Sequence, residues 1–338
     1  MKGTEYTKII HNLVVPETLS DEEKGKSYEP LMDYLKSNTP DKLFRFRRCK
    51  ERTFNEFDQD VLSFSPASEM NDDFDGMLYF DKERIKSKVF DAVKPEKIKS
   101  MLESIRTGNA PEPKLYQIAQ PLLDLSADEI NLLCNQFTVF VTKDYDKRMT
   151  FLSQVTQTQK IACLSESIKS AAMWGYYAQN STGFALSYDL RAPDFSGYTL
   201  VPIIYGNERF DATEYTEWLF QQQVMQRILF KNGLSFWYQK LQHTIPCPDL
   251  FMATKVLIHK AISWQHEKEW RLVYTPKNGD SRKYPYISKR PSALYLGKNI
   301  SAIHEKILRH IAVEKNIPVY KMMICEENHT YNLTPKLL

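Results

Sequence analysis

The sequence predicts an α+β fold in which a mainly antiparallel central sheet carries two helical insertions. Short stretches that are apolar, or that alternate between apolar and polar residues, occur from residue 42 to residue 324 without the regular strand–helix alternation of a parallel sheet. Between them lie two longer stretches with helical spacing, which place the insertions at about 82–158 and 206–262. With 338 residues and no internal repeat, the chain is expected to form a single domain over residues 1–338.

Capping residues mark the ends of the expected helices. A helix is predicted at 20–38, because Ser20 can cap its start and Pro40 follows its end. In the first insertion, Ser126 followed by Glu129 forms a capping box, which predicts another helix start. Further helical segments are expected at about 167–180, 211–262 and 301–314.

The first strand of the sheet is expected at 42–48. Phe44 and Phe46 should point to one side of this strand, whereas Arg45 and Arg47 point to the other, because side chains alternate along a strand. Further short strands are predicted at 61–65, 160–165, 183–190, 199–206, 270–274, 293–297 and 318–324.

The composition is that of an ordinary globular protein and argues against several classes. A net charge of +3 is too small to indicate a nucleic-acid partner by itself. The five cysteines lie singly, so neither a zinc site nor a disulfide framework is indicated, and free thiols fit a reducing cytoplasm. No apolar run suits a signal peptide or a membrane span, and no glycine-rich phosphate cradle occurs. We therefore expect a cytoplasmic protein without membrane contact.

The stretch 263–274, SWQHEKEWRLVY, combines a strand pattern with paired carboxylates. Its apolar residues alternate as in a half-buried strand, and Glu267, Glu269 and Arg271 are expected on the opposite face. Two carboxylates that project together repel, which tends to raise one pKa and suits sites that manage protons or developing positive charge. The alternative is a solvated strand edge in which Glu269 pairs with Arg271. On these grounds Glu267 and Glu269 are the candidate catalytic residues.

Two further groups of residues are candidates for binding an anion. Arg45 and Arg47 share a strand face, and two guanidinium groups make good bidentate phosphate ligands. The alternatives are an exposed sheet face, or Arg47 paired with a buried carboxylate such as Glu269. Ser165 and Ser167 lie at a strand-to-helix junction, where helix N–H groups can hold an anion. The alternative is that either serine simply caps the helix.

Aromatic residues follow one helical turn later. Trp174, Tyr176 and Tyr177 could stack on a nicotinamide or adenine ring, but aromatic residues pack in a core more often. We expect packing for Trp174 and a ligand contact for Tyr177.

No metal site is predicted. The segment NDDFD, 71–75, lacks the full pattern of a calcium loop and is typical of a turn stabilised by its own carboxylates. His259 and His266 do not form the His-Glu-x-x-His pattern of a zinc hydrolase.

Six stretches occur in the order seen in a bacterial family. They are Phe44-Arg45-Phe46-Arg47, the turn FSPASEMNDDFD, Cys163-Leu164-Ser165-Glu166, Met173 and Trp174 with Tyr177 and Ala178, Gly183-Phe184, and Trp264 with Glu267, Glu269, Trp270 and Arg271. In combination, over about 42–300, they resemble the family known as domain of unknown function 2971. Asp73 replaces a proline of the family pattern. The resemblance implies a relative in fold, because the family name carries no activity.

A more distant resemblance suggests a chemistry. The order of an arginine on a first strand, Ser-x-Ser on a middle strand and Glu-x-Glu on a late strand is similar to the Arg-Ser-Glu pattern of NAD-using ADP-ribosyltransferases. The matching residues are Arg47 or Arg45, Ser165 with Ser167, and Glu267 with Glu269. In that family the arginine holds the NAD phosphates and the serine supports the nicotinamide-ribose pocket. The last glutamate stabilises the oxocarbenium-like centre, and the earlier one can orient an acceptor.

The resemblance implies an NAD-dependent ADP-ribosyltransferase or NAD glycohydrolase, with NAD as substrate and a macromolecule, protein or nucleic acid, or water as acceptor. Such an enzyme would suit a bacterial toxin or phage-defence effector. One alternative is a non-catalytic sensor or interaction module of a defence system, in which the insertions carry partner contacts. A second alternative is a metal-dependent nuclease that uses Asp72, Asp75 and Glu269.

Overall fold

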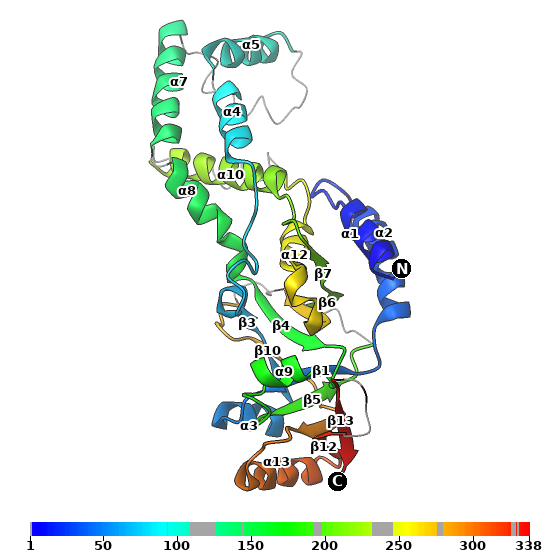
Figure 1. Cartoon of the computed structure of the whole chain (residues 1–338). Helices are drawn as coiled ribbons and strands as arrows, with labels where there is room; N and C mark the ends of the chain where they lie inside the picture. The colour runs from blue at the N-terminus through cyan, green and yellow to red at the C-terminus, as the bar shows by residue number, and fades with distance from the viewer. Residues whose placement is uncertain are drawn as a thin grey trace.

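The protein has an α+β fold, as the sequence predicts. The computed structural model describes residues 2–92, 94–108, 123, 126–143, 145–191, 198–231, 246–275, 280–325, 329 and 331–338. Its central feature is a mixed, mostly antiparallel sheet of nine strands (Figure 1). No described helix is long and apolar enough to span a bilayer.

Eight strands of this sheet follow one another in the order β13-β12-β11-β5-β1-β4-β9-β6. The ninth strand, β3, pairs with β4 along the edge that also pairs with β1. Every pairing is antiparallel except that of β11 with β12. The strands are β1 (Leu43–Arg47), β3 (Ser65–Pro66), β4 (Lys160–Ser165), β5 (Phe184–Tyr188), β6 (Tyr198–Pro202), β9 (Glu269–Tyr274), β11 (Ala293–Leu296), β12 (Val319–Ile324) and β13 (Leu333–Leu337). Two small two-stranded sheets pair β10 (Tyr286–Ser288) with β2 (Val61–Ser63), and β7 (Ile204–Gly206) with β8 (His259–Ala261).

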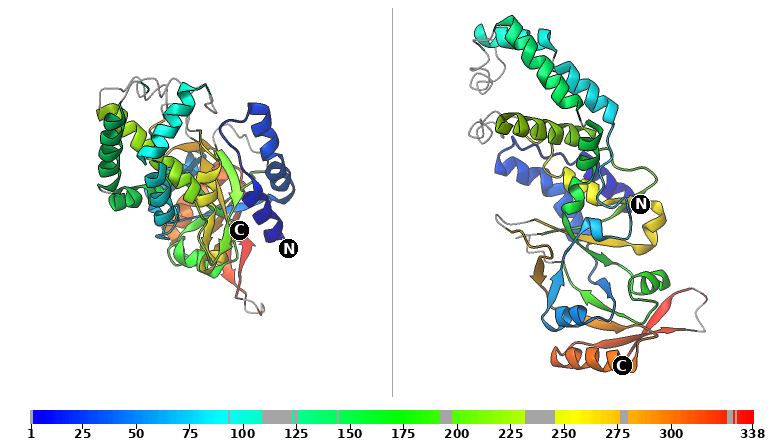
Figure 2. Two further views of the ribbon diagram at one scale, coloured as in Figure 1. Left: turned by 90° about the horizontal axis from the view of Figure 1, so that it is seen from above. Right: turned by 90° about the vertical axis from the view of Figure 1, so that its left-hand side faces the viewer.

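Helices gather at both ends of the molecule. Most helices of the insertion regions stand at one end, whereas α3 and α13 lie next to each other at the other end (Figures 1 and 2). The helices are α1 (Lys2–Asn12), α2 (Asp21–Asn38), α3 (Glu51–Asp58), α4 (Lys82–Ala92), α5 (Pro95–Arg106), α7 (Ala127–Thr142), α8 (Tyr145–Ser153), α9 (Ala171–Tyr176), α10 (Thr213–Lys231), α12 (Met252–Leu257) and α13 (Ala302–Glu314). Short 3₁₀ turns are η1 (Ala67–Glu69), η2 (Val155–Thr158) and η3 (Ile262–Glu267).

The predicted helix caps are confirmed. Ser20 accepts a hydrogen bond from the backbone N–H of Glu23, whose side chain accepts one from Ser20 in return, so α2 starts with a capping box. Ser126 and Glu129 form the same arrangement at the start of α7. The helix expected at 167–180 is shorter, because α9 ends at Tyr176.

The two predicted insertions pack on each other. Residues of α4, α7 and α8 from the first region share one buried cluster with residues of α10 and α12 from the second. An example is the edge-to-face contact of Tyr145 with Phe220, whose ring centroids are 5.6 Å apart. Residues 109–122 and 232–245 of these predicted insertions lie outside the described part of the chain. The helical regions thus form one common body rather than two separate appendages.

The two faces of the sheet are buried in different clusters. Leu43, Leu164 and Leu272 belong to the large core on one face. Phe44 and Trp174 belong to a smaller cluster on the other face, with Phe46 packed against it. The alternation predicted for the first strand is therefore confirmed, and by register Arg45 and Arg47 project to the Leu43 face.

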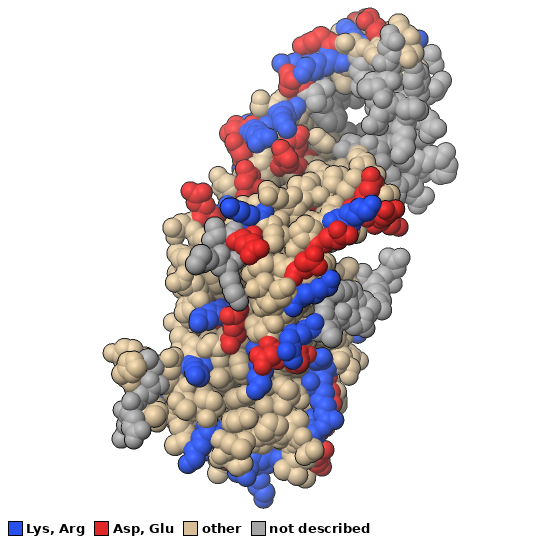
Figure 3. Space-filling view, turned by 90° about the vertical axis from the view of Figure 1, so that its right-hand side faces the viewer, with Lys and Arg blue, Asp and Glu red and all other residues tan. Residues whose placement is uncertain are grey.

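The described surface carries mixed charge. On the face shown in Figure 3, Lys and Arg are interspersed with Asp and Glu. This distribution agrees with the small net charge of +3.

Candidate functional site

A cavity of about 480 Å³ opens where strands β1 and β4 diverge. β1 pairs with β4 at one position, Phe44 opposite Ser165, and β3 pairs with the other end of β4 through Ser65 opposite Ile161. Between these points the cavity is lined by residues of both strands, including Phe46 and Cys163. Residues that project to opposite faces of the sheet, such as Arg45 and Phe46, therefore line the same cavity.

The paired glutamates reach this cavity from a turn rather than from one continuous strand. The prediction of a strand through Glu267 is wrong: Glu267 ends η3, Lys268 adopts a left-handed conformation with φ of 45°, and β9 begins at Glu269. Ser165 Oγ donates to the carbonyl oxygen of Glu267 at 2.6 Å, which holds the turn against β4. The two carboxylates meet because of this turn, and not through strand alternation.

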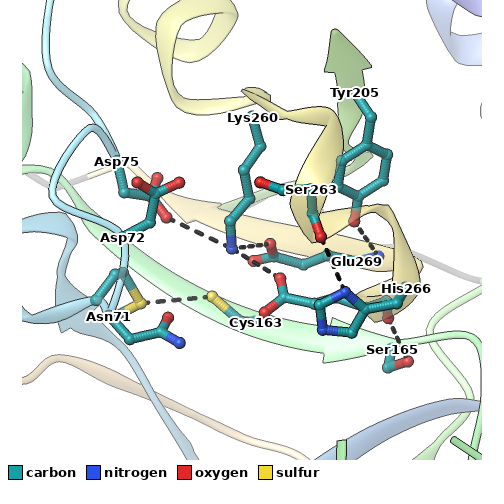
Figure 4. A network of polar contacts seen from close by, with 12 residues as sticks. Asn71, Asp72, Asp75, Cys163, Ser165, Tyr205, Lys260, Ser263, His266 and Glu269 are labelled. Carbon is teal, nitrogen blue, oxygen red and sulfur yellow. Dashed lines mark hydrogen bonds and ion pairs between the residues drawn. The ribbon is translucent and has the colours of Figure 1, made fainter. Parts of the chain in front are cut away.

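Lys260, on β8, joins the two carboxylates. Its Nζ lies 2.7 Å from Glu267 Oε2. The same atom lies 3.2 Å from Glu269 Oε2 (Figure 4). Because both distances are measured to the same nitrogen atom, the two carboxylate oxygens lie no farther apart than these distances taken together. Asp75 Oδ2 is 3.9 Å from the same nitrogen. All four side chains are buried.

Arg271 completes the charged cluster beneath the cavity. Its guanidinium group binds Asp75 in a bidentate manner, with both N–O distances 2.6 Å, and its Nε donates to Glu269 Oε1 at 2.7 Å. Such paired contacts fix the geometry of a carboxylate. The predicted alternative of a solvated strand edge is wrong, because Glu269 and Arg271 pair with each other while fully enclosed by protein.

The two glutamates differ in protonation behaviour. Burial, and then the charge of Glu269, raises the pKa of Glu267. Burial also tends to raise the pKa of Glu269, but the charges of Arg271 and Lys260 outweigh it and lower this pKa to about 2. Two carboxyl groups whose pKa values are pushed apart are suited to separate roles, one exchanging a proton and the other remaining ionised.

The cluster carries more carboxylates than cations. Asp75, Glu267 and Glu269 face Lys260 and Arg271, so the group has a net charge of −1 when Glu267 is ionised. A positive charge placed next to this cluster would stabilise the ionised form of Glu267, because charges interact strongly where water is excluded.

Tyr177 and Asn71 cover Glu267 on the cavity side. The Tyr177 hydroxyl lies within hydrogen-bonding distance of Glu267 Oε1 and 3.1 Å from Asn71 Oδ1, so it can donate its proton to either. Burial and the nearby Glu267 raise the pKa of Tyr177, which keeps it a neutral donor. Both residues line the cavity.

Arginines line the same cavity. Arg45, Arg47 and Arg48 all contribute to its wall. Arg47 forms an ion pair with Glu56 of α3, whereas Arg45 is 8% exposed and reaches only Ser63 Oγ, at 3.5 Å, among the described residues. Burial lowers the pKa of both Arg45 and Arg47, which shows the cost of enclosing two like charges.

The remaining predicted ligand-binding residues lie outside the cavity wall. Ser165 is fully buried and holds the Glu267 turn, and Ser167 accepts a hydrogen bond from the backbone N–H of Lys169 at 3.3 Å. Trp174 is fully buried, and its Nε1 donates to the carbonyl oxygen of Ile168 at 2.7 Å. Ser165 and Trp174 therefore fix neighbouring segments of the chain and do not form the cavity wall.

Sequence reasoning missed Lys260 as a site residue. A signal was available, because Lys260 lies within the mostly apolar stretch VLIHKAISW, residues 256–264, and a buried lysine needs partners. It also assigned Asp75 to a turn or a metal loop. The turn itself is present, since Asp72 Oδ1 accepts from the backbone N–H of Phe74 at 3.0 Å, but Asp75 binds Arg271 instead.

The described residues include no group of three or more His, Cys, Asp or Glu side chains placed to share a metal ion. Of the trio considered for a nuclease, Asp75 and Glu269 lie together, but their oxygens are bound by Arg271 and Lys260.

This site belongs to an α+β protein with a carboxylate cluster beside the cavity between β1 and β4. The sequence model of the family described as "Protein of unknown function (DUF2971)" matches residues 173–272, so the chain contains a DUF2971 domain there. This match is shorter than the resemblance read over 42–300. It includes Tyr177, Lys260 and Glu267, but neither the arginines of β1 nor Asp75. Comparison with curated proteins and with solved structures gives no match.

Proposed function

We propose that the chain is an NAD-consuming enzyme, either an ADP-ribosyltransferase or an NAD glycohydrolase. The observation that carries the proposal is one cavity whose wall contains both arginines and a carboxylate cluster, which has a net negative charge when Glu267 is ionised. NAD has matching polarity, because its diphosphate is anionic and its nicotinamide ring is cationic. Arg45 and Arg47 would bind the phosphates, and the nicotinamide ribose would lie near Glu267 and Glu269.

Catalysis would be mainly electrostatic. When the bond between nicotinamide and ribose C1′ breaks, its electron pair leaves with neutral nicotinamide, and positive charge develops on the ribose. Ionised Glu269 and its surrounding cluster would stabilise that charge. The acceptor, or water, then forms a bond to C1′, and its proton passes to Glu267, whose raised pKa suits a general base.

The test is to incubate the protein with NAD and measure free nicotinamide, with and without protein or nucleic-acid acceptors. Release of nicotinamide is expected, and Glu269→Gln or Glu267→Gln should lower the rate by roughly 100-fold or more. Asp249→Asn is a matched control, because Asp249 forms a buried ion pair with Lys255, 2.8 Å long, outside the cavity wall. Absence of nicotinamide under every condition, or equal activity of the Glu269 variant, would contradict the proposal.

One observation favours a second candidate, a non-catalytic nucleotide sensor. Both oxygens of Glu269 are already engaged, since Oε1 accepts from Arg271 and Oε2 accepts from Lys260 and Arg271. Saturable NAD binding without nicotinamide release would favour this candidate. For either function we propose a cytoplasmic setting, which the five free cysteines support, and a role as a bacterial defence or toxin effector, which rests on the sequence resemblance.

A further inference from the structure

A second cavity, of about 250 Å³, lies on the other side of Lys260. Lys260 lines both cavities, and the second one is otherwise formed by the 72–77 loop, the segment 206–210 after β7, and the α12–β8 region. This volume is below the range of about 300–1,000 Å³ that is usual for drug-sized ligands. The second cavity therefore admits a single small ring system rather than a whole dinucleotide.

Aromatic rings and one guanidinium group form the mouth of the second cavity. Phe74 is 61% exposed, so its ring is accessible to a ligand. The guanidinium carbon of Arg209 lies 5.4 Å from the Phe74 ring centroid and 5.7 Å from that of Tyr79. Deeper in the wall, the Phe210 and His259 rings are 4.7 Å apart. Planar groups of this kind provide faces on which another flat ring can stack.

Polar groups line the same cavity. Asp72 is 9% exposed; its Oδ1 accepts from the backbone N–H of Phe74, and its Oδ2 has no hydrogen-bonding partner among the described residues. Asn207 and Glu208 add exposed acceptors. Arg209 donates to the carbonyl oxygen of Met77 at 2.6 Å and forms no ion pair within the described part of the chain. The cavity thus offers acceptors inside and a positive charge at its mouth.

We propose that the second cavity binds a nucleobase. A base is flat enough to stack on Phe74 and Arg209, and its amino and imino groups can donate to Asp72 and Glu208. The phosphate attached to its sugar would meet the guanidinium group of Arg209 at the mouth. The base comes either from a free nucleotide or from a single-stranded nucleic acid. This site is separate from the proposed NAD cavity and does not require NAD chemistry.

The shared wall gives the second cavity a route to the carboxylate cluster. Lys260 Nζ contacts Glu267 and Glu269, and the same side chain lines the second cavity, where the base would bind. A ligand that shifts Lys260 would therefore change the charge balance around Glu267.

The test is a titration of the full chain by calorimetry with AMP, CMP, GMP and UMP, and with single-stranded oligonucleotides of the same bases. Saturable binding is expected for at least one base, weakened about tenfold by Phe74→Ala or Arg209→Ala. Phe151→Ala and Arg290→Ala are matched controls. Phe151 is 60% exposed on α8, and Arg290 also donates to a backbone carbonyl, that of Lys315. Both controls should bind like the parent.

The two sources of the base are distinguished by the ligands. Mononucleotide binding as tight as that of the oligonucleotides assigns the site to free nucleotides, whereas much tighter, salt-sensitive oligonucleotide binding assigns it to a nucleic-acid strand. Two results would overturn the proposal: no binding of any probe at millimolar concentration, or binding that is lost in Arg47→Ala and unaffected by Phe74→Ala. Nicotinamide release is measured separately, so its absence would count against the proposed NAD activity and not against this site.

Discussion

Replacing Lys260 with methionine should destabilise the protein in a manner that depends on pH. Lys260 is buried, and its Nζ contacts Glu267 at 2.7 Å and Glu269 at 3.2 Å. Methionine keeps much of the side-chain volume but removes the charge, which leaves Asp75, Glu267 and Glu269 with Arg271 as their cation. Removing one partner of a buried ion pair typically costs about 3–5 kcal/mol.

The sign of the pH dependence follows from the two glutamates. The pKa of Glu267 is already raised in the folded state. Protonated Glu267 therefore contributes stability at low pH. This contribution is lost as the pH rises from the unfolded pKa of about 4.3 through the folded pKa. Lys260 lowers the pKa of both glutamates, so its removal raises both. The stability deficit of the variant should therefore be largest at pH 7–8 and shrink towards pH 5.

Thermal unfolding of parent and variant between pH 5 and pH 8 measures this effect. At roughly 2–3 °C per kcal/mol, the melting temperature at pH 7–8 should fall by about 6–15 °C. In the double variant Lys260→Met with Glu267→Gln, part of the loss should be recovered, because the glutamine leaves no unpaired charge. A loss below about 2 °C, a loss that is equal at pH 5 and pH 8, or no recovery in the double variant would refute the reasoning.

Three further predictions concern the same site. Asp75→Asn should lower the free energy of unfolding by about 3–5 kcal/mol, measured with urea, because it removes the bidentate partner of buried Arg271; a loss below 1 kcal/mol would contradict this. Tyr177→Phe should raise the carboxyl pKa of Glu267 further, followed by ¹³C NMR titration, since the Tyr177 hydrogen bond lowers it; an unchanged midpoint would argue against the contact. Gly183→Ala should destabilise the fold by about 1–3 kcal/mol in the same urea assay, because a Cβ would collide with the Arg47 carbonyl oxygen on β1; parent-like stability would show that β1 can shift freely.

Local patterns sufficed for much of the fold. The capping boxes at Ser20 and Ser126, the alternation around Phe44, and the strand at 160–165 all depend on residues close in sequence, where propensity and burial act together. The start of β9 could not be read in this way. Its apolar alternation is genuine, but the left-handed Lys268 breaks the chain direction immediately before Glu269, and nothing in the local sequence requires that turn.

The candidate site depends on contacts between distant segments, and this limits what its sequence reveals. Glu267 and Glu269 stood out because two carboxylates close in sequence are a local signal. Lys260 and Asp75 did not, because their importance comes from meeting Arg271 and the glutamates across the fold. The network is therefore visible only in the folded structure, because each of its members is an ordinary residue in the sequence.

The unbalanced charges around the cavity support the proposal that the site binds a ligand. Ion pairs that serve stability alone should balance, since each unpaired buried charge costs several kcal/mol. Here the carboxylate cluster around Lys260 has one acid in excess, and the buried guanidinium group of Arg45 has no carboxylate partner among the described residues. Direct pairing of these opposite charges would neutralise both, yet by register Arg45 and Glu269 project to opposite faces of the sheet. A ligand with an anionic part and a cationic part could neutralise Arg45 and the carboxylate cluster at once. This is the physical reason for proposing that the cavity binds a dinucleotide rather than serving a purely structural role.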